Sequence, residues 1–273
     1  MLLLVEDNRL LFMQSIYNIP VPTIWMAVVK QVFGLEAEIE AVRFYESKKN
    51  QVSKLRLRTP QGLKEVIAKK YVWGDGDAEF SVLKKAYSLE LGVPRPIAHI
   101  GGVLFTEAVE GEKLRAPVSV QQAEGLGGWL NRFHKAMTPA PARGTFLRGD
   151  CRLVNFLFQA QGQKIYGLDF EQAYFGSPEL EVAEFMASLL AVSGTERILQ
   201  SWPLAAILAF LRGYGGGLDL EGLYECTTKN LHNSLEFCPE RVEEIQATLH
   251  SWQTSKKEIL QELARNWEGE KQS

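Results

Sequence analysis

Residues 147–180, LRGDCRLVNFLFQAQGQKIYGLDFEQAYFGSPEL, contain the polar residues that decide how this chain is interpreted. Asp150 is followed five residues later by Asn155, and Asp169 closes the second of two apolar runs. Such runs are typical of short strands, so we expect the three polar side chains at strand ends. A turn-forming role explains a single Asp or Asn, but it explains this ordered set poorly.

Three oxygen-bearing side chains in this order are typical of phosphoryl transfer from a metal-bound nucleotide. In that chemistry one carboxylate takes the proton of the acceptor, while an amide and a second carboxylate hold Mg²⁺. The set therefore predicts a nucleotide and magnesium site around Asp150, Asn155 and Asp169.

Composition sets broad limits on the class of protein. The chain has 273 residues, of which 46% are hydrophobic and 23% charged, enough for one large domain or two lobes. A net charge of −3 gives no basic surface, so no nucleic-acid partner is expected. Three cysteines without a motif indicate a reducing, cytoplasmic location. The short apolar start MLLLV and the lack of an 18-residue apolar run predict neither a signal peptide nor a transmembrane segment.

Residues 1–107 are predicted to form a β-rich N-terminal lobe. Helical spacing over residues 23–34 is followed by alternating apolar and polar residues, which predict an antiparallel meander. The expected strands are 37–45, 52–59, 63–73, 97–100 and 102–107. A helix over residues 77–91 interrupts them, with Asp75 or Asp77 as its N-cap.

Residues 108–273 are predicted to form a mainly helical C-terminal lobe. The expected helices are 119–137, 179–193, 203–213, 220–235 and 239–267, with the strand pair of the 147–180 stretch between the first two. The fold class is therefore α+β: an antiparallel sheet lobe and a helical lobe that form one continuous domain, linked near residues 106–111.

Two segments of the N-terminal lobe fit a nucleotide site. Lys69 and Lys70 lie on opposite faces of their strand because strand side chains alternate. One of them could hold phosphates and pair with Glu79 on the next helix, although isolated strand lysines and surface glutamates are mostly solvated. Residues 105–111 end a strand and leave through glycine, so their backbone could face an adenine edge.

Together these segments resemble the aminoglycoside phosphotransferase and choline kinase family, a branch of the two-lobed protein-kinase-like fold. The resemblance runs from about residue 36 to residue 235. The family pattern H-G-D-x-x-x-x-N is matched by residues 148–155, and (I/L)-D-(F/W)-(E/D) by residues 168–171. The pattern G-D-P-x-x-D-(L/V)-A is matched by residues 176–183. Further matches are residues 92–96 and 130–134.

The resemblance implies roles for the residues of the 147–180 stretch. Asp150 would orient and deprotonate the acceptor hydroxyl, while Asn155 and Asp169 would ligate Mg²⁺. Arg152 stands where many protein kinases keep a lysine near the γ-phosphate, and a cation there would stabilise charge on the transferring group. A salt bridge within its own loop is the equally weighted alternative for Arg152.

The resemblance also implies roles in the N-terminal lobe. Lys69 would contact the α- and β-phosphates and pair with Glu79. It is preferred to Lys70 by a small margin, because a small apolar residue precedes it. The backbone of Thr106 and Ala108 would read adenine.

The chain departs from the family pattern at several positions. Arg148 replaces the usual histidine and is expected to affect loop anchoring rather than chemistry, while Ser177 and Glu181 replace two aspartates. The loop between the first strands has no G-x-G-x-x-G. It offers Lys48 and Lys49 instead, which either reach the β- or γ-phosphate or are solvated.

The resemblance predicts a phosphotransferase that uses ATP (or GTP) and Mg²⁺ to phosphorylate the hydroxyl of a small molecule, such as an amino sugar or amino alcohol. Only seven residues separate Glu171 from Glu179, too few for a protein-substrate platform. Aromatic and acidic residues of the later helices either line a site for a cationic acceptor or belong to the core. They are Trp202, Tyr214, Tyr224, Trp252, Glu221 and Glu225.

Two other functions stay open. A catalytically impaired, nucleotide-binding regulatory protein is consistent with the altered Arg148 and Ser177, although Asp150, Asn155 and Asp169 are intact. A lipid-sugar kinase or an atypical protein kinase is the other, and no basic membrane-facing cluster supports it. The sequence does not fix the oligomeric state.

Overall fold

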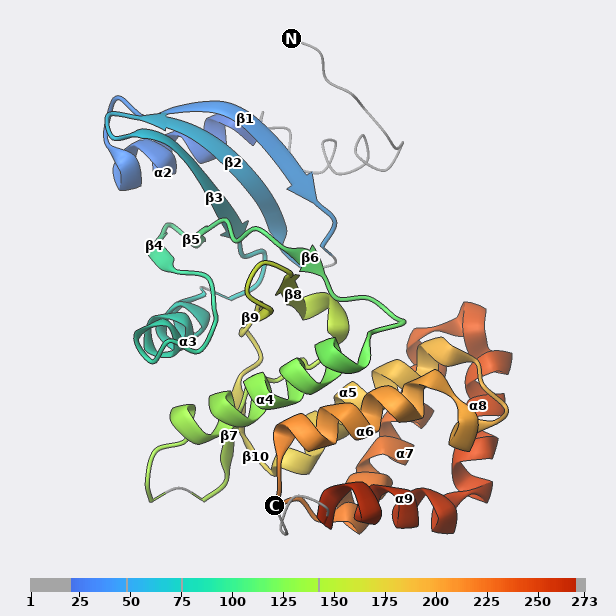
Figure 1. The fold of residues 1–273 in the computed structure, drawn as a ribbon. Helices are drawn as coiled ribbons and strands as arrows, with labels where there is room; N and C mark the ends of the chain where they lie inside the picture. The colour runs from blue at the N-terminus through green and yellow to red at the C-terminus, as the bar shows by residue number, and fades with distance from the viewer. Residues whose placement is uncertain (1–20, 48, 75, 142, 269–273) are drawn as a thin grey trace. The chain divides into compact units, whose positions relative to one another are not determined.

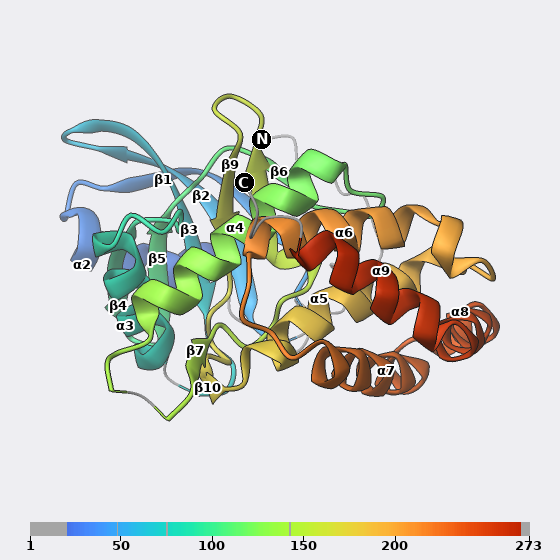
Figure 2. The same ribbon diagram turned by 60° about the horizontal axis from the view of Figure 1, so that its bottom comes forward.

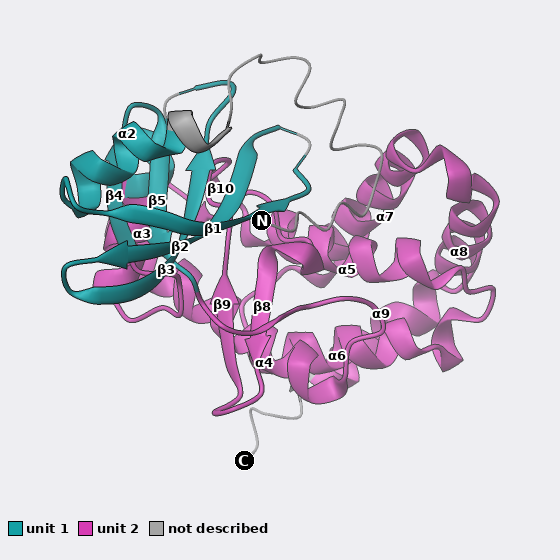
Figure 3. Cartoon of the chain, turned by 90° about the horizontal axis from the view of Figure 1, so that it is seen from above, with its two compact units in different colours: residues 1–80, 96–108 teal, residues 81–95, 109–273 magenta. Residues whose placement is uncertain are grey.

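The computed structural model describes residues 21–47, 49–74, 76–141 and 143–268. The expectations for the apolar start, Lys48 and Asp75 lie outside these residues. The chain divides into two compact units, residues 1–80 with 96–108 and residues 81–95 with 109–273 (Figure 3). Residues 81–95, which the sequence placed in the first lobe, are thus grouped with the second unit.

The first unit is built on one antiparallel sheet (Figure 1). Among the described residues it has five strands in the order β1-β2-β3-β5-β4. They are β1 (Glu38–Tyr45), β2 (Gln51–Thr59), β3 (Gly62–Lys70), β4 (Pro96–Ile100) and β5 (Val103–Glu107). β3 ends at Lys70 instead of the predicted residue 73. Gly74 and Gly76 follow with φ of 78° and 79°, left-handed conformations that cannot continue a strand.

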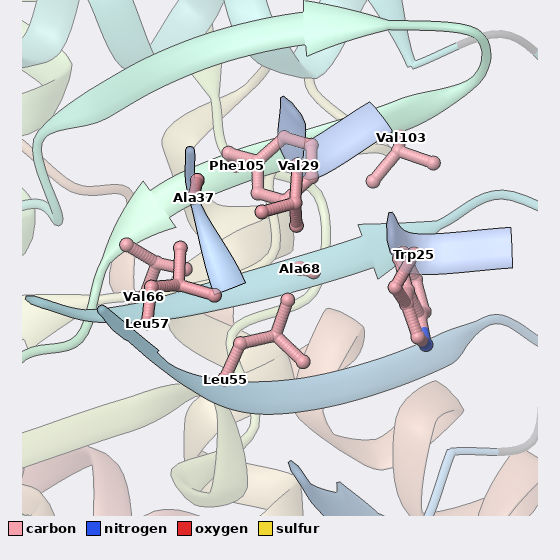
Figure 4. Packing of buried hydrophobic residues seen from close by; sticks show 9 residues of the cluster. All are labelled: Trp25, Val29, Ala37, Leu55, Leu57, Val66, Ala68, Val103 and Phe105. Atoms are coloured by element: carbon pink, nitrogen blue, oxygen red, sulfur yellow. The ribbon is translucent and has the colours of Figure 1, made fainter. Parts of the chain in front are cut away.

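Helix α2 (Val21–Phe33) packs on this sheet and completes the core of the first unit. It ends at Gly34, whose φ of 101° is the conformation that glycine favours after a helix. Figure 4 shows the buried residues, which include alternate positions of β2, β3 and β5. They are Trp25, Val29, Ala37, Leu55, Leu57, Val66, Ala68, Val103 and Phe105. Helix α3 (Asp77–Ser88) follows β3 and ends three residues earlier than predicted.

The second unit is mainly helical (Figure 2). Its helices are α4 (Val120–Met137), α5 (Pro178–Ser193), α6 (Trp202–Tyr214), α7 (Leu220–Phe237), α8 (Val242–Thr254) and α9 (Lys256–Glu268). The single helix predicted over residues 239–267 is therefore wrong. The chain breaks at Ser255, whose backbone leaves the helical conformation with φ of −102° and ψ of 20°. In the described residues, no helix combines the length and apolar character needed to cross a membrane.

Short strands of the second unit place the two halves of the 147–180 stretch. β6 (Glu112–Lys113), β8 (Phe156–Gln159) and β9 (Lys164–Gly167) form one small sheet, while β7 (Thr145–Leu147) and β10 (Tyr174–Gly176) form another. β7 leads directly into Arg148, and β9 ends two residues before Asp169. Asp150 and Asp169 therefore follow strand ends, while Asn155 lies directly before the first residue of β8.

Helices α4 and α6 lie side by side, and glycines allow their close approach (Figure 2). A Cβ added at Gly127 of α4 would overlap the carbonyl oxygen of Phe210, and one at Gly213 of α6 would overlap that of Glu124. The two backbones are in direct contact, so this packing requires glycine at both positions.

Candidate functional site

Asp150 lies between β7 and the 3₁₀ turn η1 (Leu153–Asn155) and is 6% exposed. Arg152 binds the Asp150 carboxylate with two hydrogen bonds. Arg152 Nε donates to Oδ1 at 2.6 Å, and Nη2 donates to Oδ2. Burial acts to raise the pKa of Asp150, but the hydrogen bond and charge of Arg152 outweigh it, so the pKa is below its ordinary value. Of the two roles considered for Arg152, the structure displays the salt bridge within its own loop.

Asn155 connects this loop to the segment that carries Asp169. Its side-chain amide donates to the Asp150 carbonyl at 3.2 Å, and its own carbonyl accepts the N–H of Leu168 at 2.8 Å. The structure therefore brings Asp150, Asn155 and the start of the Asp169 segment onto adjacent, hydrogen-bonded stretches of chain.

Asp169 has a left-handed backbone with φ of 61°, which is uncommon for a residue other than glycine. Arg148 fixes this segment, because its Nη2 donates to the carbonyls of Leu168 and, at 3.1 Å, Asp169. The guanidinium carbon lies 4.6 Å from the ring centroid of Phe156 and 5.3 Å from that of Phe170, and the side chain is fully buried. The departure at position 148 thus serves loop anchoring, as expected.

Glu181 of α5 holds the backbone on the other side of Asp150. Its carboxylate accepts the N–H groups of Arg148 at 3.0 Å and Gly149 at 2.9 Å. His134 Nε2 lies 2.8 Å from the same carboxylate, and His134 Nδ1 lies 2.8 Å from the Tyr214 hydroxyl. Glutamate in place of the family's aspartate therefore still binds the loop.

Glu184, one turn further along α5, was not singled out from the sequence. Its carboxylate accepts the N–H of Cys151 at 2.9 Å, the residue directly after Asp150. Burial, together with the charges of Asp150 and Glu181, raises the pKa of Glu184 to about 7. The spacing of three residues from Glu181 was the available sequence signal, because such residues share a helix face.

Glu171 is a second residue that the sequence analysis quoted without a role. One carboxylate oxygen of Glu171 lies within 4.8 Å of one of Asp169. Both side chains are half-buried. The pair offers oxygen donors of the kind that Mg²⁺ prefers.

Three of the six residues considered for the acceptor site are buried in the core. The buried ones are Tyr214, Tyr224 and Trp252. The last two stack on each other, with ring centroids 5.0 Å apart. Glu221 and Glu225 both pair with the ammonium of Lys256, at 3.0 Å and 3.2 Å, and Trp202 is half-buried at the start of α6. Of the two alternatives, the core therefore describes Tyr214, Tyr224 and Trp252. An acceptor lining stays a prediction for Trp202, Glu221 and Glu225.

In the first unit, Lys69 and Glu79 form the ion pair that the resemblance implied. Lys69 Nζ donates to Glu79 Oε2 at 2.7 Å, and the residues are 9% and 3% exposed. Lys70, on the opposite face of β3, is not part of this pair. The geometry favours Lys69 as the phosphate lysine, which stays a prediction.

Thr106 and Ala108 lie at the end of β5. Thr106 stands opposite Ile67 of β3, and the Ala108 N–H donates to the Glu65 carbonyl at 3.2 Å. The Ala108 N–H is therefore used within the first unit. Reading adenine with that group would require exchange of this hydrogen bond.

Three solved structures with the same fold are kinases by name, and the names of all three refer to small molecules. The chain matches an amicoumacin kinase in complex with AMP-PNP, Ca²⁺ and Ami with a TM-score of 0.61 and 13% identity, covering 91% of this chain and 96% of that one. A microcompartment-associated aminopropanol kinase matches with a TM-score of 0.60 and 12% identity. The match covers 88% of this chain and 99% of that one. A Plasmodium vivax ethanolamine kinase matches with a TM-score of 0.58 and 10% identity. The match covers 95% of this chain and 93% of that one.

These similarities confirm the predicted fold: an antiparallel sheet followed by a mainly helical part, as in kinase-like proteins. The chain is structurally similar to proteins of the aminoglycoside phosphotransferase and choline kinase type. No protein-family model matches the chain. Among curated proteins, the EKC/KEOPS complex subunit BUD32 of Encephalitozoon cuniculi is 27% identical over 124 residues, or 44% of this chain. The match spans 57% of that relative's length.

Proposed function

We propose that this chain is a phosphotransferase that uses ATP and Mg²⁺ to phosphorylate a hydroxyl group of a small molecule. The observation that carries the proposal is the position of Asn155. Its side chain binds the Asp150 carbonyl, and its backbone binds the residue before Asp169. A candidate base and two candidate metal ligands are thereby held by one hydrogen-bonded set, which phosphoryl transfer requires.

Asp150 acts as the base in this proposal. Its lowered pKa keeps the carboxylate ionised at neutral pH, so it can accept the hydrogen bond and then the proton of a hydroxyl. Both carboxylate oxygens are bound by Arg152, whose side chain is 59% exposed. We infer that the guanidinium turns toward the transferring phosphoryl group when nucleotide binds, which frees Asp150 and stabilises the developing charge.

Asn155 and Asp169 fit a magnesium ion by the chemistry of their donors, an amide oxygen and a carboxylate oxygen. Arg148 holds the Asp169 backbone in its left-handed conformation, and strained residues of this kind cluster at functional sites. Glu171 offers a further carboxylate beside Asp169. Bound Mg²⁺ would neutralise charge on the nucleotide phosphates.

The first unit supplies the nucleotide contacts in this proposal. Lys69 binds the α- and β-phosphates, and Glu79 sets its orientation through their 2.7 Å ion pair. The backbone of Thr106 and Ala108 reads adenine, after the Ala108 N–H gives up the Glu65 carbonyl. Binding of AMP-PNP by the amicoumacin kinase of the same fold supports a nucleotide of this class.

The proposed acceptor is a small molecule with a hydroxyl and an amine. Two proteins of the same fold are named for ethanolamine and aminopropanol, which carry both groups. Asp150 is ionised at neutral pH and Glu184, with a pKa of about 7, is ionised in part, so the two carboxyl groups favour a cationic acceptor over an anionic one.

Turnover of Mg·ATP with a panel of amino alcohols and amino sugars tests the proposal. Asp150→Asn should lower turnover by roughly 10²-fold or more, as expected for loss of a general base, while nucleotide binding remains. Asp219→Asn is the matched control, because it removes the same charge from an exposed N-cap that Asn can also fill. Failure of the wild-type protein to bind Mg·ATP, or full turnover in Asp150→Asn, would contradict the proposal.

A nucleotide-binding regulatory protein is the second candidate. The double hydrogen bond from Arg152 to Asp150 favours it, because the candidate base is occupied. The curated relative is named as a subunit of a complex. Binding of Mg·ATP without transfer to any small acceptor, to added protein or to the chain itself would favour this candidate over the enzyme.

A further inference from the structure

Tyr71 contacts both members of the Lys69–Glu79 pair. Its hydroxyl donates to Glu79 Oε2, the same oxygen that accepts Lys69 Nζ at 2.7 Å. Its ring also faces the lysine, with Lys69 Nζ 5.0 Å from the ring centroid. Tyr71 and Lys69 are two residues apart, so strand alternation puts both side chains on one face. The Tyr71 N–H donates to the Gly102 carbonyl at 3.1 Å, which keeps the backbone in register past the end of β3.

The burial of Glu79 makes this contact important. A carboxylate that is 3% exposed must be paired and hydrogen-bonded to remain charged. A lysine that also binds a nucleotide divides its donors between phosphate oxygens and Glu79. The Tyr71 hydroxyl supplies a donor to Glu79 that does not depend on how Lys69 is engaged.

We infer that Tyr71 is a positioning residue for the phosphate lysine. It acts through Glu79 by its hydroxyl and on Lys69 by its ring face, an attraction between cation and aromatic ring. The role of Lys69 in nucleotide binding rests on the proposed function. The position of Lys69 does not, so the two can be tested separately.

The loop after β3 is built to accept the Tyr71 ring. A Cβ added at Gly76 would overlap the Cε2, Cδ2 and Cζ atoms of that ring. On another side, the His99 ring lies edge-on, with centroids 6.2 Å apart. Gly74 has nearly the same φ as Gly76, 78° against 79°, but no atom lies within 4 Å of its added Cβ. The two glycines are therefore a matched pair for substitution.

Chemical labelling of lysines tests the inference without any nucleotide. In the full chain, Tyr71→Phe should raise the rate at which an amine-specific reagent modifies Lys69 by roughly threefold to tenfold, the scale of one ordinary hydrogen bond. The neighbouring Lys70, read in the same mass spectrum, should not change. Equal Lys69 rates in Tyr71→Phe and the wild type would overturn the inference.

Glycine substitutions and nucleotide binding complete the test. Gly76→Ala should raise Lys69 labelling as Tyr71→Phe does, while Gly74→Ala, with equal backbone strain, should not. Tyr71→Phe should also raise KM for ATP by roughly tenfold with a smaller change in kcat, and should add nothing in a Glu79→Gln background. Undiminished effects of Tyr71→Phe in that background would count against action through Glu79. If Tyr71→Phe changes Lys69 labelling but the wild type does not bind Mg·ATP, the proposed function is contradicted and the role of Tyr71 in positioning Lys69 is still supported.

Discussion

At the scale of single residues, Arg148 shows what sequence reasoning reaches and where it stops. Its motif position predicted an anchoring role, and the structure has its guanidinium on the carbonyls of Leu168 and Asp169. The grip of Arg152 on Asp150 was one of two equal alternatives. A long side chain chooses its partner by tertiary neighbours, which motif spacing does not encode. Glu184 was missed for the same reason, because its partner lies 33 residues away.

Glu184 gives a pH-dependent prediction at this scale. Its pKa of about 7 lies above the ordinary 4.5, so the folded state prefers the protonated form. Stability from this group is therefore fully present below pH 4.5 and is lost as the pH rises to about 7. The free energy of unfolding of Glu184→Gln should equal that of the wild type at pH 4.5. At pH 8 it should exceed the wild-type value by on the order of 1–3 kcal/mol, measured by urea unfolding.

Glu179, on the same helix, is the control with the opposite sign. Burial acts to raise its pKa, but hydrogen bonds from the Ser177 hydroxyl and the Asp219 N–H lower it below the ordinary value. The ionised Glu179 therefore stabilises the folded protein at pH values above its ordinary pKa, and this stabilisation is lost as the pH falls. Glu179→Gln should therefore not gain stability at pH 8. A gain as large as that of Glu184→Gln would mean that general charge reduction on α5, rather than the site of Glu184, is responsible.

At the scale of elements, length decided what could be predicted. The long helices α4 and α7 carry several turns of periodic apolar residues, so their positions follow from the sequence. β6, β7 and β10 have two or three residues, too few to show a period. The break between α8 and α9 falls at Ser255, with neither glycine nor proline beside it, so it left no ordinary stop signal in the sequence.

The crossing of α4 and α6 gives a prediction for packing. Gly127→Ala should destabilise the protein by about 1–3 kcal/mol, because its Cβ would overlap the Phe210 carbonyl in the partner helix. Gly128→Ala, one residue on, meets its nearest atoms at 3.5 Å and should be neutral or stabilising by up to about 1 kcal/mol. Thermal unfolding of both variants measures the difference, and equal effects would mean that the helices can separate without cost.

At the scale of the whole molecule, the order of a sheet followed by helices was predictable, but the extent of each unit was not. Residues 81–95 belong with the second unit because of contacts distant in sequence. Gly92 O accepts both the indole N–H of Trp129 at 3.1 Å and the backbone N–H of Gly167 at 3.0 Å, and Lys85 binds the Met137 carbonyl. Composition along the chain does not reveal such bonds.

Ligand-linked stability gives the prediction at this scale. If the proposed function holds, Mg·ATP at 100 times its Kd should stabilise the full chain by about 2.7 kcal/mol, a rise in Tm of several degrees. EDTA should remove most of this rise, and so should Asp169→Asn, since asparagine also tolerates the left-handed backbone. The Asp219→Asn variant should show the same rise in Tm with Mg·ATP as the wild type. A rise that persists in EDTA would argue against a metal-dependent nucleotide site.

The contacts of Glu181 also limit how this protein can change during evolution. One carboxylate is shared by two N–H groups of the loop and by His134, which in turn reaches Tyr214. Loss of any one partner leaves a buried polar group unsatisfied, so single exchanges are selected against even where a double exchange would be acceptable. We therefore expect natural variation at positions 134, 181 and 214 to be constrained jointly, with paired substitutions more frequent than single ones.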